Sequence, residues 1–258
     1  MNRPRMILPA LMSASALIAA PLAGMGAEVI DKGSFKIYRH GRAMGAETFE
    51  ISEGQDSVVV RGRQFLTIPT SKGDEPLEKG VDILVSRQDY AFRVYQSTRN
   101  FQGTTMTRAL VMADTHYVAY RESGGVGDGE SRVLPPGHLF VMDGQVVTLF
   151  DLLCRSLHQA SFTSRSLNLL ALGPRDTMLD ARAVMLGTET IRWGNKPVVA
   201  RKLQLVADSQ TTFTLWMGSQ GQLLRLNEPK GGLRVDRDAP DVKRRPPPPK
   251  PNEPKPGG

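Results

Sequence analysis

Residues Ser34–Ser52 read SFKIYRHGRAMGAETFEIS, and their pattern indicates the class of fold. Apolar and polar side chains alternate in Ser34–Arg39 and again in Thr48–Ser52. This period of two is typical of a β-strand with one buried face. Between the two runs, His40-Gly41-Arg42 supplies turn-forming residues, so the stretch predicts an antiparallel hairpin.

The same period continues along most of the chain. Further alternating runs occupy Ser57–Thr67, Val81–Arg87, Tyr90–Ser97, Thr105–Met112, Thr115–Arg121, Asp180–Trp193, Lys196–Val206, Thr211–Met217 and Gln222–Leu226. Their β-branched and aromatic residues fit a pleated, half-buried surface. Short strands in regular succession predict an all-β fold, a curved antiparallel sheet of the barrel, sandwich or β-roll type.

Two connections are longer than tight turns. Pro69–Gly80 is polar and charged, and Glu122–Gly137 holds five glycines and two prolines. We expect both to be loops, either solvated hairpin excursions or segments beside a binding mouth.

One segment, at about residues 143–157, breaks the period of two and predicts the principal helix. Its apolar residues recur every three or four positions, as on one face of an α-helix: Val146, Leu149, Phe150, Leu153 and Leu157. We expect Asp143 to cap the first turn, because a carboxylate is favourable there. Such an amphipathic helix either plugs the open end of the sheet or forms a lid over a ligand cavity.

The N-terminus has the composition of a secretory signal peptide. Arg3 and Arg5 precede the uncharged run Met6–Leu22, and the small residues 23–27 follow. This order predicts cleavage near residue 26 and a periplasmic or otherwise exported protein, with an uncleaved membrane anchor as the alternative. After residue 27 no apolar run is long enough to span a bilayer, so the mature chain is expected to have no transmembrane segment.

The C-terminus is predicted to be a disordered tail. Residues 239–258 contain eight of the eighteen prolines together with several Lys and Arg residues, a composition that excludes sheet and helix. The tail is expected to be either simply solvated or a contact for an envelope surface. Between the signal peptide and the tail we predict one antiparallel β-domain, residues 28–238, and the alternative is two small domains joined at Gly124–Gly137.

The net charge of +7 falls mainly on the two ends. Residues 1–26 carry two unopposed arginines, and residues 239–258 carry five basic against two acidic side chains, which leaves a nearly neutral body. A phosphate backbone has no general attraction for such a body, so no nucleic acid partner is expected.

Catalytic and metal-binding motifs are absent from the sequence. It contains neither Gly-x-Ser-x-Gly nor Ser-x-x-Lys, and its four histidines are scattered. Cys154 falls near the helix's apolar stripe and is expected to be a small buried hydrophobe, with a catalytic nucleophile as the alternative. The sequence therefore predicts no cofactor, no metal and no catalytic residues.

The candidate ligand-binding residues are apolar or basic. Phe150 and Leu153 on the helix, and Trp193 and Trp216 beside hairpin turns, are our candidates for lining a ligand site, with core packing as the alternative for each. A second set would bind an anion if its members met on one face: Arg61, Arg63, Arg87 and Arg93.

The order of these elements resembles a known group of proteins. A hairpin at Phe35–Phe49, a helix that starts at Asp143, and a hairpin at Leu215–Leu226 that leads into Leu233–Val235 follow one another. This order is similar to that of a diffuse group of uncharacterised exported bacterial β-proteins, themselves similar to glycolipid-binding proteins with a spiralled β-roll. The resemblance covers about residues 30–237. It implies a curved sheet around an apolar interior and the handling of lipid or glycolipid.

The sequence is compatible with three functions. The first is an exported, non-enzymatic protein that binds an apolar or amphipathic envelope molecule such as a lipid or glycolipid. The second is a structural or assembly partner in the cell envelope. The third is a hydrolase whose site is assembled from residues distant in sequence.

Overall fold

The structure is a computed structural model that describes residues 27–144, 146–208 and 211–240. The predicted signal peptide lies outside these residues, and so does the predicted tail beyond Pro240. No helix in these three ranges is long and apolar enough to cross a membrane.

The described residues form strands β1–β15 and the helix α2. The strands are β1 (Glu28–Arg39), β2 (Arg42–Glu53), β3 (Ser57–Thr70), β4 (Gly73–Ser86), β5 (Phe92–Phe101), β6 (Thr104–Met112), β7 (His116–Ser123), β8 (Val126–Val133), β9 (Leu139–Asp143), β10 (Ser164–Leu172), β11 (Thr177–Trp193), β12 (Lys196–Val206), β13 (Thr212–Met217), β14 (Leu223–Glu228) and β15 (Leu233–Arg237). The helix is α2 (Thr148–His158).

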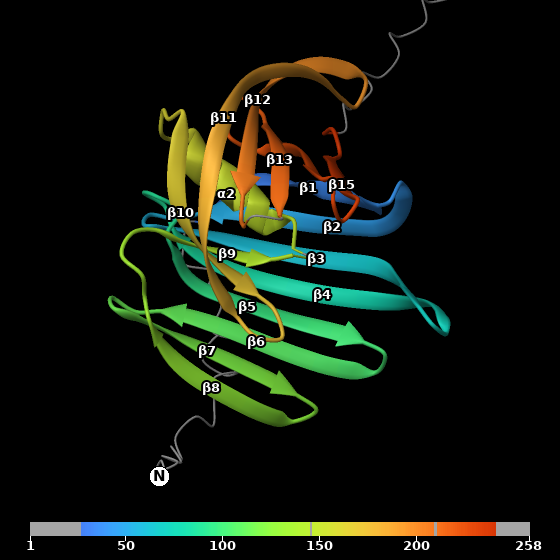
Figure 1. Cartoon of the computed structure of the whole chain (residues 1–258), viewed down its shortest axis with the longest axis vertical. Coiled ribbons are helices and arrows are strands. Elements are labelled where there is room, and N and C mark those ends of the chain that lie inside the picture. The colour runs from blue at the N-terminus through green and yellow to red at the C-terminus, as the bar shows by residue number, and fades with distance from the viewer. Residues whose placement is uncertain (1–26, 145, 209–210, 241–258) are drawn as a thin grey trace, which may run out of the picture.

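All fifteen strands belong to one curved, unclosed sheet (Figure 1). Their order is β8-β7-β6-β5-β4-β3-β2-β1-β15-β14-β13-β12-β11-β10-β9, so the first strand of the chain lies in the middle and bonds to the last. The predicted all-β class, with a curved sheet and one principal helix, is confirmed. The predicted antiparallel arrangement is wrong at β9 and β10, which pair in parallel because the chain crosses over through α2 between them.

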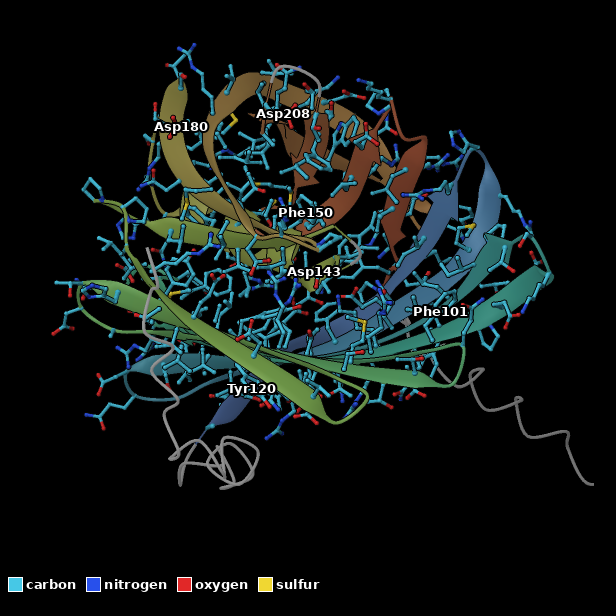
Figure 2. All side chains as sticks on the ribbon, turned by 60° about the horizontal axis from the view of Figure 1, so that its bottom comes forward. Phe101, Tyr120, Asp143, Phe150, Asp180 and Asp208 are labelled. Atoms are coloured by element: carbon cyan, nitrogen blue, oxygen red, sulfur yellow. The ribbon has the colours of Figure 1, made fainter. Side chains whose placement is uncertain are left out.

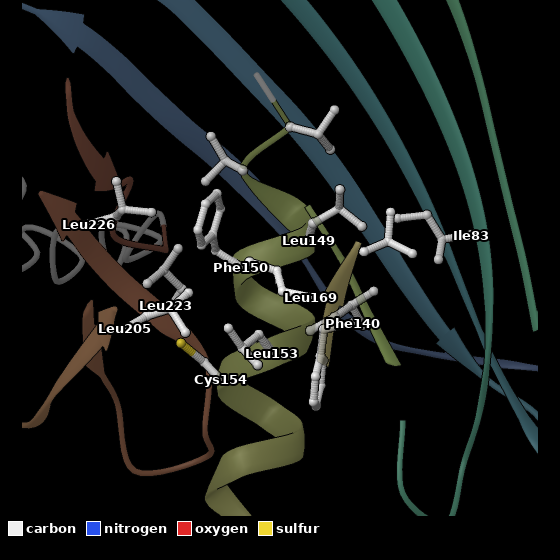
Figure 3. Packing of buried hydrophobic residues seen from close by; sticks show 14 of the residues in the cluster. Ile83, Phe140, Leu149, Phe150, Leu153, Cys154, Leu169, Leu205, Leu223 and Leu226 are labelled. Carbon is white, nitrogen blue, oxygen red and sulfur yellow. The ribbon is translucent and has the colours of Figure 1, made fainter. Parts of the chain in front are cut away.

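The helix lies against the concave face of the sheet, inside the curve (Figure 3). The predicted stripe of five apolar residues is buried, but so is every other residue from Thr148 to Leu157. Strands therefore surround α2 instead of leaving one side to solvent. Of the two roles expected for the helix, this burial fits the plug.

The helix begins later than predicted, and Asp143 does not cap it. Asp143 ends β9, and the helix has Val147 at its N-cap position without a side-chain cap hydrogen bond. The carboxylate at the first turn belongs to Glu47 of β2, which accepts hydrogen bonds from the backbone N–H groups of Val147 and Thr148, each at 2.8 Å. An acidic side chain 100 residues earlier thus satisfies the open amides of the helix.

A glycine makes this approach of strand and helix possible. Gly62 of β3 faces inward, and a Cβ there would lie 2.7 Å from Val81 Cγ2 and 3.6 Å from Thr148 Oγ1. Any side chain at this position would therefore push β4 or the start of α2 away.

A network of buried charges connects the first and last strands, β1 and β15, to the helix. Asp151 of α2 is fully buried, and its carboxylate accepts hydrogen bonds from Arg155 at 2.7 Å and from the N–H of Leu223 at 2.6 Å. Arg237 of β15 donates to Asp31 of β1 at 2.6 Å. Arg155 also pairs with Asp31, so α2, β1, β14 and β15 meet in one polar network.

Both long loops predicted from the sequence are hairpins. Within Pro69–Gly80, only the turn between β3 and β4 lies outside a strand, because polar side chains are compatible with the solvent face of paired strands. Within Glu122–Gly137, the turn at Gly124-Gly125 leads into β8, a strand exposed along its whole length. Its glycine and charge content hid the strand pattern.

Candidate ligand-binding site

A cationic pocket lies at one end of the concave face. Its volume is about 490 Å³, and four neighbouring strands each place a basic side chain in its wall: Lys79 from β4, Arg99 from β5, Arg108 from β6 and Arg121 from β7. Asp143, at the end of β9, also lines the pocket. Figure 2 shows Asp143 and Phe150 near the centre of the molecule, between the two halves of the sheet.

The strand pattern explains why these basic side chains point inward. Lys79 occupies the same alternating positions in β4 as the buried Val81 and Ile83, and Arg99 continues the positions of Tyr95 in β5. Because side chains alternate across a strand, residues two apart share one face. The basic residues thus extend the buried face of each strand toward the pocket.

Lys79 and Asp143 form a buried ion pair at the floor of the pocket. Lys79 is only 5% exposed, and its Nζ pairs with Asp143 Oδ2. The hydroxyl of Tyr95 donates to the same oxygen at 2.9 Å. Burial lowers the pKa of Lys79, and burial together with the charge of Asp143 raises the pKa of Tyr95 well above its usual value, which keeps the hydroxyl protonated as a donor.

Arg108 and Arg121 hold the turn between β10 and β11. Arg108 donates to the carbonyl oxygen of Gly173 at 2.6 Å, and Arg121 donates to that of Pro174 at 2.5 Å. Arg121 also lies 2.6 Å from the carboxylate of the buried Asp176. Both arginines therefore join β6 and β7 to the opposite half of the sheet, where no strand pairing connects the two.

Arg99 is the cation of the pocket without a carboxylate partner among the described residues. It is half-buried, its guanidinium lies 5.8 Å from the ring centre of Phe101, and its Nε is buried without a hydrogen-bond partner. A buried donor of this kind costs free energy until an acceptor reaches it. The pocket is consequently electropositive at Arg99.

An apolar cavity adjoins the cationic pocket. Its volume is about 60 Å³, and its walls come from β1, β2, β3, β14, β15 and the start of α2. The lining includes Met44, Leu66, Ile68 and Phe150. Gly144 lines both this cavity and the cationic pocket, so the two spaces share a wall at the segment that leads into the helix.

The four ligand-lining candidates of the sequence do not meet at one site. Phe150 lines the apolar cavity, and Leu153 joins it around a smaller void of about 10 Å³. Trp216 packs in a separate small cluster with Ile191, on the other face of the sheet, and Trp193 packs against that cluster. Trp193 also lines a wide recess of about 920 Å³ at the end where Asp31 pairs with its arginines.

The remaining candidates are also placed by the structure. Arg61 and Arg63 are exposed on the outer face of β3, Arg87 follows β4 and pairs with Glu53, and Arg93 is exposed on β5, so none of the four lines the cationic pocket. Cys154 is fully buried, which raises the pKa of its thiol. Nowhere in the three described ranges do three His, Cys, Asp or Glu side chains gather so that they could hold a metal ion.

Sequence reasoning did not predict the basic residues of the pocket, although the sequence contains a signal for them. Arg108 and Leu110 share the inward face of β6, and Arg121 shares that of β7 with Tyr117 and Ala119. A basic residue in the apolar positions of a strand is unusual, because it buries a charge. Four such residues on consecutive strands indicate a polar site inside the sheet.

Comparisons with known proteins support the fold and leave the function open. No protein-family model matches the sequence, and no curated protein matches it. Among solved structures, the chain is similar to a β-barrel-like protein of the domain of unknown function DUF1849 from Brucella abortus. The TM-score is 0.53 at 8% identity, over 82% of this chain and 97% of the other. At this identity the likeness shows a shared β-barrel-like fold.

Proposed function

We propose that this chain is an exported, non-enzymatic binding protein of the cell envelope. In this proposal it holds an apolar or amphipathic molecule, such as a lipid or glycolipid, beside α2. The observation that carries the proposal is the apolar cavity between the helix and the central strands, walled almost entirely by aliphatic side chains and Phe150. Cavities of this composition favour apolar groups over water.

The size of the cavity sets what it accepts. Its volume of about 60 Å³ is far below the roughly 300–1,000 Å³ of pockets that enclose a whole small molecule. It therefore takes the end of an apolar chain, and the rest of the ligand lies outside it. Gly144 marks one way out, because a Cβ placed there would meet no atom within 4 Å.

The binding test uses a neutral apolar fluorophore, N-phenylnaphthylamine, with dodecanol as competitor. We expect fluorescence to rise with the wild-type protein and to fall when dodecanol displaces the probe. Ile68→Arg should abolish the signal, because Ile68 is partly buried in the cavity wall. Val111→Arg is the matched control, since Val111 is 44% exposed on β6 and does not line the cavity. Equal binding by both variants would contradict the proposal.

Export is supported by the sequence of residues 1–26. N-terminal sequencing of the protein purified from its own cell should give a start near Ala27. Native mass spectrometry of the same preparation should show a co-purifying lipid-like mass that Ile68→Arg lacks.

A second candidate function is assembly within the envelope, and strand β8 favours it. β8 ends the sheet, every residue in it is exposed, and Val126 and Val133 are 78% and 71% exposed. An open edge of this kind pairs readily with a strand of another chain. A dimer or larger assembly in analytical ultracentrifugation that Val133→Lys dissolves would support this candidate.

A further inference from the structure

We propose that the cationic pocket binds the anionic group of an amphipathic ligand whose apolar chain enters the cavity beside α2. The anionic group is a phosphate or carboxylate at the end of an alkyl or acyl chain. This inference rests on the proposed function, which concerns the apolar chain alone.

The charges of the pocket favour an incoming oxyanion. Asp143 is paired with Lys79 and bonded by Tyr95, and Asp176 is paired with Arg108 and Arg121. These pairs leave Arg99 as a surplus positive charge.

The geometry of Arg99 favours an oxyanion as well. Its buried Nε has no hydrogen-bond partner in the described structure, and the side chain lines the pocket. A guanidinium presents a planar set of N–H donors that matches the oxygens of phosphate and carboxylate. An oxyanion beside Arg99 would supply both the missing acceptor and the missing negative charge.

The position of the pocket connects it with the apolar cavity. Gly144 lines both spaces, and a Cβ added there would meet no atom within 4 Å. Four basic side chains line the first space, whereas the lining of the second is apolar apart from the exposed Arg39, so together they offer an amphipathic molecule a place for each of its ends. A ligand without a charge gains nothing from the first space, and a free anion gains nothing from the second.

The experiment compares three probes by isothermal titration calorimetry: dodecyl phosphate below its micelle concentration, dodecanol, and inorganic phosphate. We expect dodecyl phosphate to bind at least about tenfold more tightly than either of the others. Arg99→Gln should weaken the binding of dodecyl phosphate about tenfold, the loss typical of one charge-assisted hydrogen bond. The affinity for dodecanol should not change. Added salt should weaken the binding of dodecyl phosphate and leave that of the uncharged dodecanol unchanged.

Arg99 is the residue to replace because it holds no ion pair, whereas Lys79→Met would leave Asp143 buried without its partner. Arg93→Gln is the matched control, since Arg93 lies on the same strand but is exposed. Gly144→Trp should weaken the binding of both chain-bearing probes, because the indole would fill the space that borders both the pocket and the cavity. Thermal melts of every variant check that the fold is retained.

Three results would contradict the inference. If dodecanol binds as tightly as dodecyl phosphate, the inference is overturned and the proposed function stands. If inorganic phosphate binds as tightly as dodecyl phosphate, the pocket is a free-anion site and the inference is again overturned. If neither chain-bearing probe binds, the proposed function fails and the inference fails with it.

Discussion

At the scale of single residues, Glu47 shows how one side chain can fix the place of a helix. Its carboxylate accepts hydrogen bonds from two backbone amides of α2 and from the side-chain amide of Gln64 at 3.0 Å. The side-chain hydroxyl of Thr148 donates to it as well. All of these groups are buried, so each donor depends on this acceptor.

We therefore expect Glu47→Gln to lower the free energy of unfolding by about 1–3 kcal/mol, the cost of a buried donor left without its acceptor. The glutamine keeps the size of the side chain but turns an N–H₂ group toward the N–H groups of the helix. Urea denaturation measures the change. Glu50→Gln, on the same strand, is the control and should change stability by less than about 0.5 kcal/mol. Equal stabilities for the two variants would mean that Glu47 does not anchor the helix.

His158, at the C-terminal end of α2, gives a pH-dependent prediction. Its Nδ1 lies 3.2 Å from Nη1 of Arg201. Burial and the charge of Arg201 lower the pKa of His158. The folded protein thus prefers the neutral imidazole, whereas the unfolded chain protonates it at about pH 6.5. The stability that His158 contributes is present above that pH and is lost as the pH falls through it.

The free energy of unfolding should accordingly fall more steeply in the wild type than in His158→Gln between about pH 7 and about pH 5. Urea titrations at a series of pH values measure this difference. A wild-type slope in His158→Gln would show that other groups cause the loss.

At the scale of elements, α2 is expected to act as a plug. Phe150 is 4% exposed and packs against Phe213 with ring centres 4.9 Å apart. Phe150→Ala should lower the free energy of unfolding by about 3–5 kcal/mol, as for other large-to-small changes in a core. Val199→Ala, at a position 68% exposed on β12, is the control and should cost less than about 0.5 kcal/mol. A small loss for Phe150→Ala together with weaker binding of dodecanol would instead identify a lid.

The strands and the helix could be predicted because their information is local. The alternation around Phe35 and Ile51 and the helical spacing of Leu149 and Leu153 follow from the burial of one face, and both are visible within a dozen residues. The parallel pairing of β9 and β10 could not be predicted in the same way, because it depends on where the crossover places β10.

The candidate site was harder to predict because its residues meet only in the folded chain. The helix cap comes from Glu47 instead of the neighbouring Asp143, since Asp143 is engaged by Lys79 and Tyr95. Lys79 is 64 residues from Asp143, and no spacing rule joins positions so far apart. What the sequence does hold is the inward position of each basic residue on its own strand.

At the scale of the whole molecule, the seam between β1 and β15 is predicted to be essential and the tail dispensable. Removing residues 241–258 should leave the melting temperature within about 2 °C of that of the full chain, because β15, the last strand of the described residues, ends at Arg237 and the proline-rich composition beyond it does not build a core. Removing residues 233–258 also deletes β15 and the buried Arg237, and should prevent stable folding. Differential scanning calorimetry of both truncations tests this prediction. A large drop for the shorter deletion would show that the tail docks on the sheet.

Residues 28–238 are predicted to form one domain. We expect a single cooperative unfolding transition, because one cluster of buried residues runs through both halves of the sheet and α2. Limited proteolysis within Gly124–Gly137 should nick the exposed edge at β8 and leave the two resulting fragments bound to each other. Two separately stable fragments would contradict the prediction.

The central position of β1 also governs the order in which the protein can be completed. A ribosome delivers β1 first and β15 last, yet Phe35 of β1 pairs with Arg237 of β15. The meander from β1 to β8 can form early, but its concave apolar surface stays open until the helix and the later strands arrive. Contacts so distant in sequence slow folding, and aggregation-prone intermediates therefore persist for longer. We therefore expect a nascent chain of this protein to need chaperone protection for longer than a β-protein whose neighbouring strands all follow one another in sequence.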